Sequence, residues 1–361
     1  MEEKGKKGRM DYTLLLIVVL LVVIGLVILY STSAYNGQVK FHDSFYYLKK
    51  QAFATVLGIV LMLFVAGMDY HIWQRLAVFG YLAAVALSVA VMLFGREMNG
   101  SKRWLALGPF SFQPSEFAKV ALILFLADLV TKNVKTIGKM WTLCRIMFWI
   151  LPIVGLVGAS NLSTAIIILG IGVILIFVAS PKYAQFALMG IAGACFMGIF
   201  LALESYRLER LAIWRNPEKY EKGYQTLQGL YAIGSGGVFG VGIGNSVQKL
   251  GFVPEAQNDM IFSIICEELG LAGAGIIVFL FLLLIWRFFL IASGSRDLFG
   301  ALIATGAMAH MMIQVILNIA VVTNTIPNTG ITLPFISYGG TSVMFLLIEM
   351  GLVLSVSQVV D

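Results

Sequence analysis

The chain has 361 residues, of which 59% are hydrophobic and only 12% are charged. A soluble domain of this size cannot bury so much apolar surface, so the composition excludes a soluble globular protein and indicates an integral membrane protein. The net charge of +6 is explained by basic residues in cytoplasmic loops, and no nucleic-acid partner is expected. The three cysteines, Cys144, Cys195 and Cys266, show neither disulfide nor metal-ligand spacing.

Near-continuous apolar runs of about 17 to 25 residues follow one another, which is typical of spanning helices and not of a β-barrel. The sequence therefore predicts an all-α integral membrane protein, a polytopic bundle of about ten transmembrane helices with a long extracytoplasmic loop between spans 7 and 8. We treat residues 1–361 as one domain. The expected spans are 11–31, 51–68, 76–95, 114–131, 145–159, 163–180, 184–203, 260–291, 298–323 and 342–358.

Positive charge is distributed unequally between the two sets of loops. The N-terminal segment 1–10 and the loops on its side of the membrane hold twelve lysines and arginines. The short loops on the other side hold six, when the long loop 204–259 is left out. Because cytoplasmic loops carry the excess of positive charge, both termini are expected in the cytoplasm. Three unusual loops then face outside, at 96–113, 204–259 and 325–341.

Ionisable residues also occur inside the expected spans, where they are costly unless they pair or line a cavity. Glu116 and Lys119 stand three residues apart on a helix begun by Pro114 and Ser115, which puts them on one face within reach of an ion pair. Structural pairing or snorkelling is the simpler explanation for the others, and together they predict a polar interior. These others are Asp128, Glu267, Glu268, His310 and Glu349.

The long loop contains two distinctive stretches. The first, LESYRLERLAIW at 203–214, has apolar residues at helical spacing around Arg207 and Arg210, which predicts an amphipathic helix in the headgroup plane. The second, AIGSGGVFGVGIGNS at 232–246, is rich in glycine. No strand precedes it and it lies outside the membrane, so we do not interpret it as a nucleotide-binding loop.

The stretch GFVPEAQNDMIFSIICEELG, 251–270, runs from a polar loop straight into an apolar segment. Asp259 is therefore expected at a membrane surface, where partial desolvation raises the pKa of a carboxyl and makes it a better proton acceptor. Asp259 is a candidate general base. The alternative is that Asn258 and Asp259 simply cap the following helix.

The last outer loop, TIPNTGITLPFISYGGTS at 325–342, has two prolines, three glycines and no charge. Its composition predicts an ordered, turn-rich re-entrant segment that shapes a pocket. A mere connector is the alternative, although so much apolar turn sequence needs burial against protein to satisfy its backbone.

Four separated segments together resemble the SEDS family of bacterial cell-wall proteins (shape, elongation, division and sporulation). Their order and spacing match over nearly the whole chain, and the wording of the first is more similar to the FtsW and SpoVE members than to RodA. Where the family usually has an acidic residue after the fifth span, this chain has Asn161. The segments are NGSKRWLALGPFSFQPSEFAKVALILFLA (99–127), SNLSTAIIILGIGVILIFVA (160–179), PEAQNDMIFSIICEELG (254–270) and PNTGITLPFISYGGTS (327–342).

The resemblance implies a peptidoglycan glycosyltransferase that polymerises lipid II at the outer face of the bacterial cytoplasmic membrane. It implies as partners lipid II, the undecaprenyl-pyrophosphate-linked glycan, a class B penicillin-binding protein acting as transpeptidase, and other divisome or elongasome membrane proteins. Asp259 matches the family's essential acidic residue in the fourth outer loop. The characteristic residues of the second loop and fourth span are matched by Arg103, Ser115, Glu116 and Lys119.

Such a reaction is a single inverting displacement, for which one base is enough. The pyrophosphate leaving group needs cations, which the outer face supplies. No cofactor is required, and a divalent cation, Mg²⁺ or Mn²⁺, could share the work, although no cluster has convincing ligand spacing. The expected substrate-binding residues are Lys102, Arg103, Ser115, Glu116, Lys119, Arg207, Arg210, Lys249, Ser337 and Tyr338. A lipid II flippase and a non-catalytic division scaffold remain the rival functions.

Overall fold

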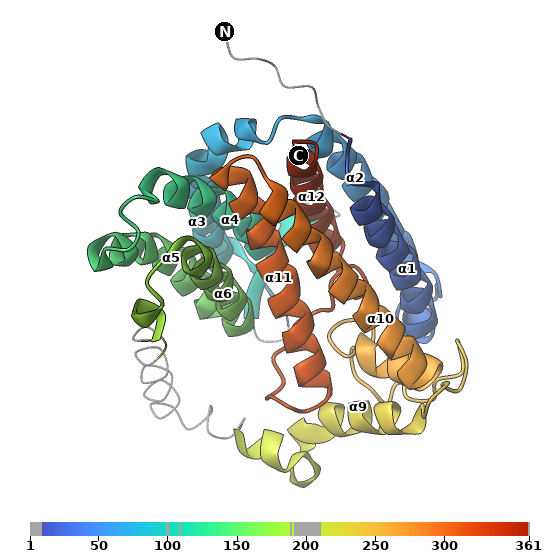
Figure 1. Cartoon of the computed structure of the whole chain (residues 1–361). Coiled ribbons are helices and arrows are strands. Elements are labelled where there is room, and N and C mark those ends of the chain that lie inside the picture. Colours follow the sequence, from blue (N-terminus) through green and yellow to red (C-terminus); the bar gives the residue numbers. More distant parts are fainter. Residues whose placement is uncertain (1–8, 99–100, 108–109, 188–189, 191–210, 360–361) are drawn as a thin grey trace.

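The computed structural model describes residues 9–98, 101–107, 110–187, 190 and 211–359 (Figure 1). Within these residues, eight helices are long and apolar enough to cross a membrane, which confirms the predicted polytopic all-α membrane fold. They are α1 (Tyr12–Phe41), α2 (Tyr46–Gly67), α3 (His71–Phe94), α5 (Met140–Ser160), α6 (Leu162–Ala179), α10 (Ile261–Gly294), α11 (Leu298–Val322) and α12 (Gly340–Ser357).

Two further expected spans differ from these eight. The fourth is present as α4 (Pro114–Asn133), which carries charged residues and packs inside the bundle against α3, α5, α6 and α11. Its Pro114 is at the first turn, where a missing N–H costs nothing. The seventh expected span, 184–203, lies mostly outside the described residues, of which 183–187 and 190 are helical.

The start of α1 and the end of α12 adjoin. The backbone N–H of Asp11 donates to Oγ of Ser357 at 3.1 Å, so both described ends of the chain lie on one side of the bundle (Figure 1). We call the opposite end of the bundle the distal side. That the distal side is the outside of the cell stays a prediction.

A small antiparallel sheet occupies the loop between α3 and α4, for which the sequence predicted an outer loop without naming strands. Its strands, in the order β1-β2-β3, are β1 (Arg96–Met98), β2 (Ser101–Leu107) and β3 (Phe110–Phe112). The register pairs Arg96 with Trp104 and Leu105 with Phe112. The sheet therefore gives the basic residues of β2 a fixed position on the distal side.

The long loop is also more structured than expected. Residues 211–215 are helical, two single 3₁₀ turns follow at Pro217–Lys219 and Glu221–Gly223, and then comes α9 (Tyr224–Ser235). Most of the predicted amphipathic helix at 203–214 lies outside the described residues. The sequence did not predict α9, because its twelve residues include two glycines and only a short apolar face.

Helix α10 is interrupted at Gly270, whose φ of 67° and ψ of −168° are not helical. The glycine-rich segment supplies the missing hydrogen bonds. The N–H groups of Val241 and Gly242 donate to the carbonyls of Glu267 and Glu268, each at 2.9 Å. In return, the carbonyls of residues 237 and 238 accept from the N–H groups of residues 271 and 272. Four backbone hydrogen bonds to the glycine-rich segment therefore replace bonds that the helix loses at Gly270.

Close packing at this interruption explains the glycines. A Cβ on Gly240 would lie 2.2 Å from the carbonyl oxygen of Glu268, and Gly240 has a φ of 77° that other residues rarely adopt. The backbone of the glycine-rich segment thus packs directly against the backbone of α10, and we call this contact the seam.

Candidate active site

Asp259 lies on the distal side, just before α10. The N-cap residue of α10 is Met260, and no side chain caps it, so neither Asn258 nor Asp259 caps the helix. The amide of Asn258 donates instead to Oε2 of Glu255 at 2.7 Å. Helix capping, the alternative explanation for the Asn258–Asp259 pair, is therefore not what the structure shows.

Three other parts of the chain meet at Asp259. From α9, Nε2 of Gln225 donates to Oδ1 of Asp259 at 3.4 Å. From α11, Nδ2 of Asn318 donates to the main-chain oxygen of Asp259 at 2.9 Å. From the loop before α12, Gly330 lies so close that a Cβ there would sit 3.7 Å from Oδ2. The carboxylate thus lies where α9, α11 and this loop converge.

The environment of Asp259 makes it a better base than an ordinary aspartate. Burial raises the pKa of Asp259 to about 6, and the nearby Glu255 carboxylate adds to this effect, while backbone N–H groups and Gln225 oppose it. The side chain is only half-buried and keeps part of its surface accessible. At neutral pH most Asp259 is therefore ionised, accessible and basic enough to accept a proton.

The loop between α11 and α12 is an ordered segment held by side-chain amides. Asn318 donates to the carbonyl of Ile331 at 2.7 Å, and Gln314 to that of Thr332 at 3.1 Å. Gln51 of α2 donates to the carbonyl of Ser337 at 3.2 Å. These bonds satisfy backbone groups that an apolar surrounding would leave unpaired, as the predicted re-entrant segment requires.

Two expected substrate-binding residues belong to this loop. Ser337 is buried, and its hydroxyl accepts from the N–H of Leu333 at 2.8 Å. The ring of Tyr338 meets that of Tyr47 edge-on at 4.9 Å, and its N–H donates to the carbonyl of Gln257 at 2.9 Å. In this structure both residues shape the loop beside Asp259.

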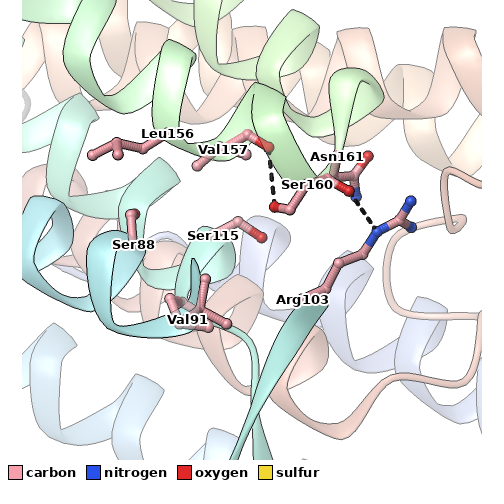
Figure 2. A pocket seen from close by; sticks show the side chains of 9 residues that line it. Ser88, Val91, Arg103, Ser115, Leu156, Val157, Ser160 and Asn161 are labelled. Carbon is pink, nitrogen blue, oxygen red and sulfur yellow. Dashed lines mark hydrogen bonds between the residues drawn. The ribbon is translucent and has the colours of Figure 1, made fainter. Parts of the chain in front are cut away.

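A second group of expected residues lies at a small pocket between α3, β2, α4 and α5 (Figure 2). Arg103 and Ser115 both line it, and Nε of Arg103 donates to the carbonyl of Ser160 at 3.0 Å. Lys102, beside Arg103 on β2, is exposed. The structure therefore brings Arg103 and Ser115 together at one pocket, and their contact with substrate stays a prediction.

Asn161 lines the same pocket and begins α6. Its Oδ1 accepts from the N–H of Thr164 at 3.2 Å as an N-cap, which needs an oxygen but no charge. Two residues later, Ser163 donates to the carbonyl of Thr329 at 2.8 Å. The first turn of α6 thus connects the Arg103 pocket to the loop that borders Asp259.

The predicted ion pair between Glu116 and Lys119 is present. Nζ of Lys119 lies 3.0 Å from Oε1 of Glu116, and both side chains are buried. The same Nζ donates to Oε1 of Gln314 at 3.3 Å. That oxygen also contacts Nε2 of His310 at 2.8 Å, and Nδ1 of His310 lies 2.8 Å from Glu349. These contacts form a buried polar network across α4, α11 and α12.

His310 was predicted from the sequence as part of a polar interior, whereas Gln314 of this network, and Asn318 four residues further along α11, were not. His310, Gln314 and Asn318 are spaced four residues apart, which places them on one face of α11. That spacing of polar side chains within an apolar span was the available signal. The expectation of structural pairing holds for Asp128, whose Oδ2 lies 2.7 Å from Lys132, and for His310 with Glu349.

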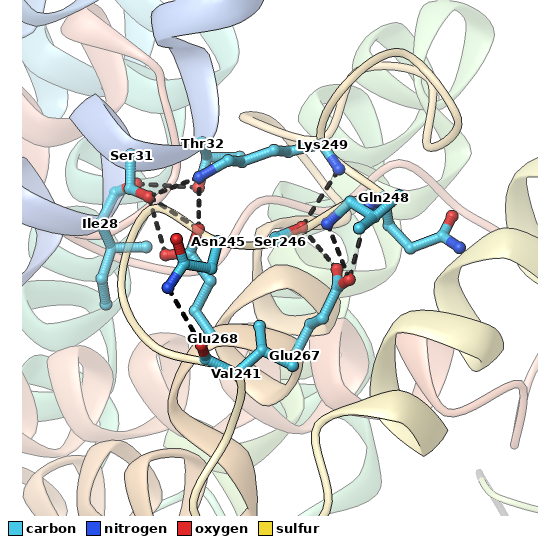
Figure 3. A network of polar contacts seen from close by, with 11 residues as sticks. Ile28, Ser31, Thr32, Val241, Asn245, Ser246, Gln248, Lys249, Glu267 and Glu268 are labelled. Atoms are coloured by element: carbon cyan, nitrogen blue, oxygen red, sulfur yellow. Dashed lines mark hydrogen bonds and ion pairs between the residues drawn. The ribbon is translucent and has the colours of Figure 1, made fainter.

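Lys249 is not part of the group around Asp259. Its ammonium is buried, lies 2.6 Å from Glu268 and donates to Oγ of Ser31 at 3.0 Å (Figure 3). The neighbouring Glu267 accepts from the hydroxyl of Ser246 and from the N–H of Val247. Lys249 therefore neutralises a buried carboxylate and does not present a surface cation.

The remaining expectations concern residues and ions that the structure leaves untested. Arg207 and Arg210 lie outside the described residues. Within the described part of the chain, no group of three or more His, Cys, Asp or Glu side chains is arranged to hold a metal ion. A divalent cation remains an expectation.

These features define a class of protein: a multi-pass helical membrane protein with a basic carboxylate on its distal side, bordered by a re-entrant loop and underlain by a buried polar network. Residues 12–361 match the model of the FtsW, RodA and SpoVE family, described as cell cycle proteins. The chain belongs to this family, the SEDS family.

Relatives and solved structures agree with this assignment. The chain is 40% identical to stage V sporulation protein E of Bacillus subtilis, with 98% of both chains covered. It is 35% identical to the probable peptidoglycan glycosyltransferase FtsW of Trichlorobacter lovleyi, covering 96% of this chain and 93% of that protein. The rod shape determining protein RodA of Thermus thermophilus superposes with a TM-score of 0.72 at 28% identity, covering 96% of each chain. A chain of a peptidoglycan synthase complex that coordinates polymerization and crosslinking gives a TM-score of 0.83 at 29% identity, covering 96% of this chain and 97% of that one.

Proposed function

We propose that this chain, a peptidoglycan glycosyltransferase of the SEDS family, polymerises lipid II into glycan strands with Asp259 as general base. The observation that carries the proposal is the position of Asp259, a half-buried carboxylate whose pKa burial raises to about 6, at the meeting point of α9, α11 and the loop before α12. The names of its relatives as glycosyltransferases support the same reaction class.

In the proposed reaction the 4-hydroxyl of the acceptor sugar attacks C1 of the donor sugar, which carries an alpha-linked pyrophosphate. Asp259 takes the hydroxyl proton as the new C–O bond forms, the bond from C1 to the pyrophosphate breaks, and the configuration inverts. Lys102 and Arg103 on β2 are the cations proposed to hold the departing pyrophosphate. The contacts from Arg103 through Ser160 and from Ser163 to Thr329 support a continuous site.

This function sets the orientation and the partner. The distal side faces out of the bacterial cytoplasmic membrane, where the substrate's sugars are, and both termini lie in the cytoplasm. The partner is a class B penicillin-binding protein that crosslinks the new strands. The similarity to a chain from a complex that coordinates polymerization and crosslinking supports this pairing.

The direct test is glycan synthesis from lipid II by purified protein with its partner transpeptidase in detergent. Asp259→Asn is expected to lower the polymerisation rate by about 10² to 10⁴. Asp43→Asn is the matched control, since it neutralises an exposed carboxylate that is paired with Lys49 on the same side. A wild-type rate for folded Asp259→Asn protein rules the proposed base out.

The same assay separates the rival functions. A lipid II flippase or a scaffold makes no glycan in detergent, where there are no two membrane sides to cross. Failure of the wild-type protein and its partner to polymerise lipid II would favour one of these two.

A further inference from the structure

The glycine-rich segment carries apolar side chains that no described part of the protein covers. Phe239 is 83% exposed, Val238 58% and Ile243 57%. The sequence has no charged residue between Lys222 and Lys249. A contiguous exposed apolar patch is unusual in water and marks a surface that meets another apolar phase. We call residues 236–243 the glycine loop.

Backbone hydrogen bonds fix the position of the glycine loop along the axis of α10. Its N–H groups and carbonyls complete the interrupted ladder of α10 on both sides of Gly270, through bonds of 2.9 Å. The loop therefore cannot shift along α10 without breaking several buried hydrogen bonds at once. Wherever Gly270 lies relative to the membrane, the glycine loop lies there too.

Two polar clusters bracket the membrane-embedded part of α1 and α10. At one end Asp11, immediately before α1, pairs with Arg287. At the other, Ser31 of α1 and Lys249 both contact Glu268 of α10. At 1.5 Å per residue, the path along α1 from Asp11 to Ser31 is about 30 Å, and that along α10 from Glu268 to Arg287 about 28 Å.

These lengths indicate how deep in the membrane the cluster around Glu268 lies. The hydrocarbon core of a bilayer is about 30 Å thick, and tilt can only shorten the depth that a helix path covers. If Asp11 lies at one edge of the core, the cluster around Glu268 lies at or inside the other edge. The glycine loop, bonded to residues 267, 268, 271 and 272, is at the same level.

The exposed surface of α10 continues this patch. Leu271, bonded to the glycine loop, is 71% exposed, and Ile276 lies a little further along the exposed face. The side chains of the glycine loop therefore extend an apolar surface that is already inside the membrane. Lys249, Glu267 and Glu268 are buried, and their polar contacts are to other protein groups (Figure 3).

We propose that the glycine loop is a lipid-contacting anchor that inserts Val238, Phe239 and Ile243 into the distal leaflet of the membrane. An aromatic ring at the edge of the hydrocarbon is a favourable anchor. Because the chain continues from this loop to Asp259, the anchor holds the distal loop at a constant height above the bilayer. The proposal does not depend on the chemistry at Asp259.

The test uses an environment-sensitive NBD fluorophore on the full-length protein in phosphatidylethanolamine and phosphatidylglycerol vesicles. The native cysteines Cys144, Cys195 and Cys266 are replaced, and Phe239→Cys is labelled. The lipid-facing control is Val56→Cys, because Val56 of α2 is 63% exposed. The water-facing control is Glu221→Cys, because Glu221 is exposed in the 3₁₀ turn before α9. Val238→Cys and Ile243→Cys replace Phe239→Cys if that variant does not fold.

Lipids carrying a doxyl quencher at carbon 5 are expected to quench the label at position 239 by at least half as much as at position 56. The label at position 221 stays unquenched. Quenching at position 239 no greater than at position 221 overturns the proposal. The proposal is also overturned if the label at position 239 becomes shielded from water only after the partner transpeptidase is added, because a protein then covers the loop.

Discussion

The side-chain amide of Asn318 binds the backbone of the proposed base: its Nδ2 donates to the main-chain oxygen of Asp259 at 2.9 Å. The same nitrogen donates to the carbonyl of Ile331 at 2.7 Å. One fully buried residue of α11 thus joins the start of α10 to the re-entrant loop. Because α11 is packed at the centre of the bundle, Asp259 is positioned from a rigid element.

Asn318→Leu keeps the approximate volume and removes both N–H donors. The buried carbonyl of Ile331 then loses a partner, at a cost of about 1 to 3 kcal/mol, and the partly buried carbonyl of Asp259 loses one as well. We expect the polymerisation rate at saturating lipid II to fall about 10- to 100-fold, since small displacements of a catalytic group are costly. Asn133→Leu, which removes an amide bonded within α4, is the control. Wild-type turnover by Asn318→Leu would show that Asp259 is positioned by other contacts.

The pH dependence of the rate follows from the pKa of Asp259. A general base must be deprotonated, so the rate should rise with pH through about 6, where Asp259 titrates. The hydrogen bond from Gln225 lowers this pKa, so Gln225→Leu should move the rise to higher pH. Glu255 raises it, so Glu255→Gln should move the rise to lower pH, although Lys40, 3.6 Å from Glu255, weakens that effect.

The two substitutions control for each other, because general damage to the site lowers the rate without moving the two profiles in opposite directions. The measurement is kcat for lipid II polymerisation at closely spaced pH values. Profiles that coincide with wild type in both variants would mean that Asp259 does not set the acidic limb.

The ionised Asp259 carboxylate should also destabilise the folded protein at neutral pH. Its folded-state pKa of about 6 lies above the ordinary value of 3.8, so its stabilising contribution is present at low pH and is lost as pH rises through 6. Above that pH the ionised group costs at most about 3 kcal/mol. Asp259→Asn should therefore raise the Tm in detergent at pH 8 and leave it nearly unchanged at pH 4. An equal Tm difference at both values would contradict this.

Much of this architecture could be predicted from the sequence, because membrane spans are encoded by long apolar runs and buried charges stand out against them. Glu116 and Lys119 were predictable as a pair because a helix places residues three apart on one face. Asp259 was predictable as a half-desolvated acid because an apolar span follows it directly.

Other features depend on contacts that a single segment does not encode. Gln225 reaches Asp259 only because the long loop folds back over α10, and Lys249 finds Glu268 through the same path. Composition showed Lys249 as a cation on the outer face, whereas the seam at Gly270 draws it inside. The small sheet at β1 to β3 was not predicted, because β1 and β3 have only three residues each and become strands by pairing with β2.

The pair of Glu116 and Lys119 should show strong non-additivity. Removing one partner strands a buried charge, which typically costs about 3 to 5 kcal/mol, while replacing both by neutral side chains of similar size can be close to neutral. Glu116→Gln and Lys119→Met should each lower Tm and activity far more than the double variant does. A double variant that folds as well as wild type but loses as much activity as either single one would assign these residues a direct role with substrate.

The last prediction concerns the seam between the glycine loop and α10. In Gly240→Ala the new Cβ would lie 2.2 Å from the carbonyl oxygen of Glu268, at a φ of 77° that alanine disfavours. Neither the α10 backbone nor the loop can yield without losing the buried hydrogen bonds that they share. We expect a loss of several kcal/mol in stability, because backbone strain and unpaired carbonyls add.

Gly234→Ala is the matched control, since Gly234 lies within α9 and a Cβ there meets nothing within 4 Å. Alanine is favoured over glycine in a helix by about 1 kcal/mol, so this variant should be as stable as wild type or more so. Thermal unfolding in detergent and hydrogen exchange at residues 267–272 provide the two measurements. Gly240→Ala should speed exchange at the interruption of α10, and Gly234→Ala should not. If both variants unfold and exchange like wild type, the seam does not depend on glycine, and the close approach of the two backbones is not what holds the interrupted helix together.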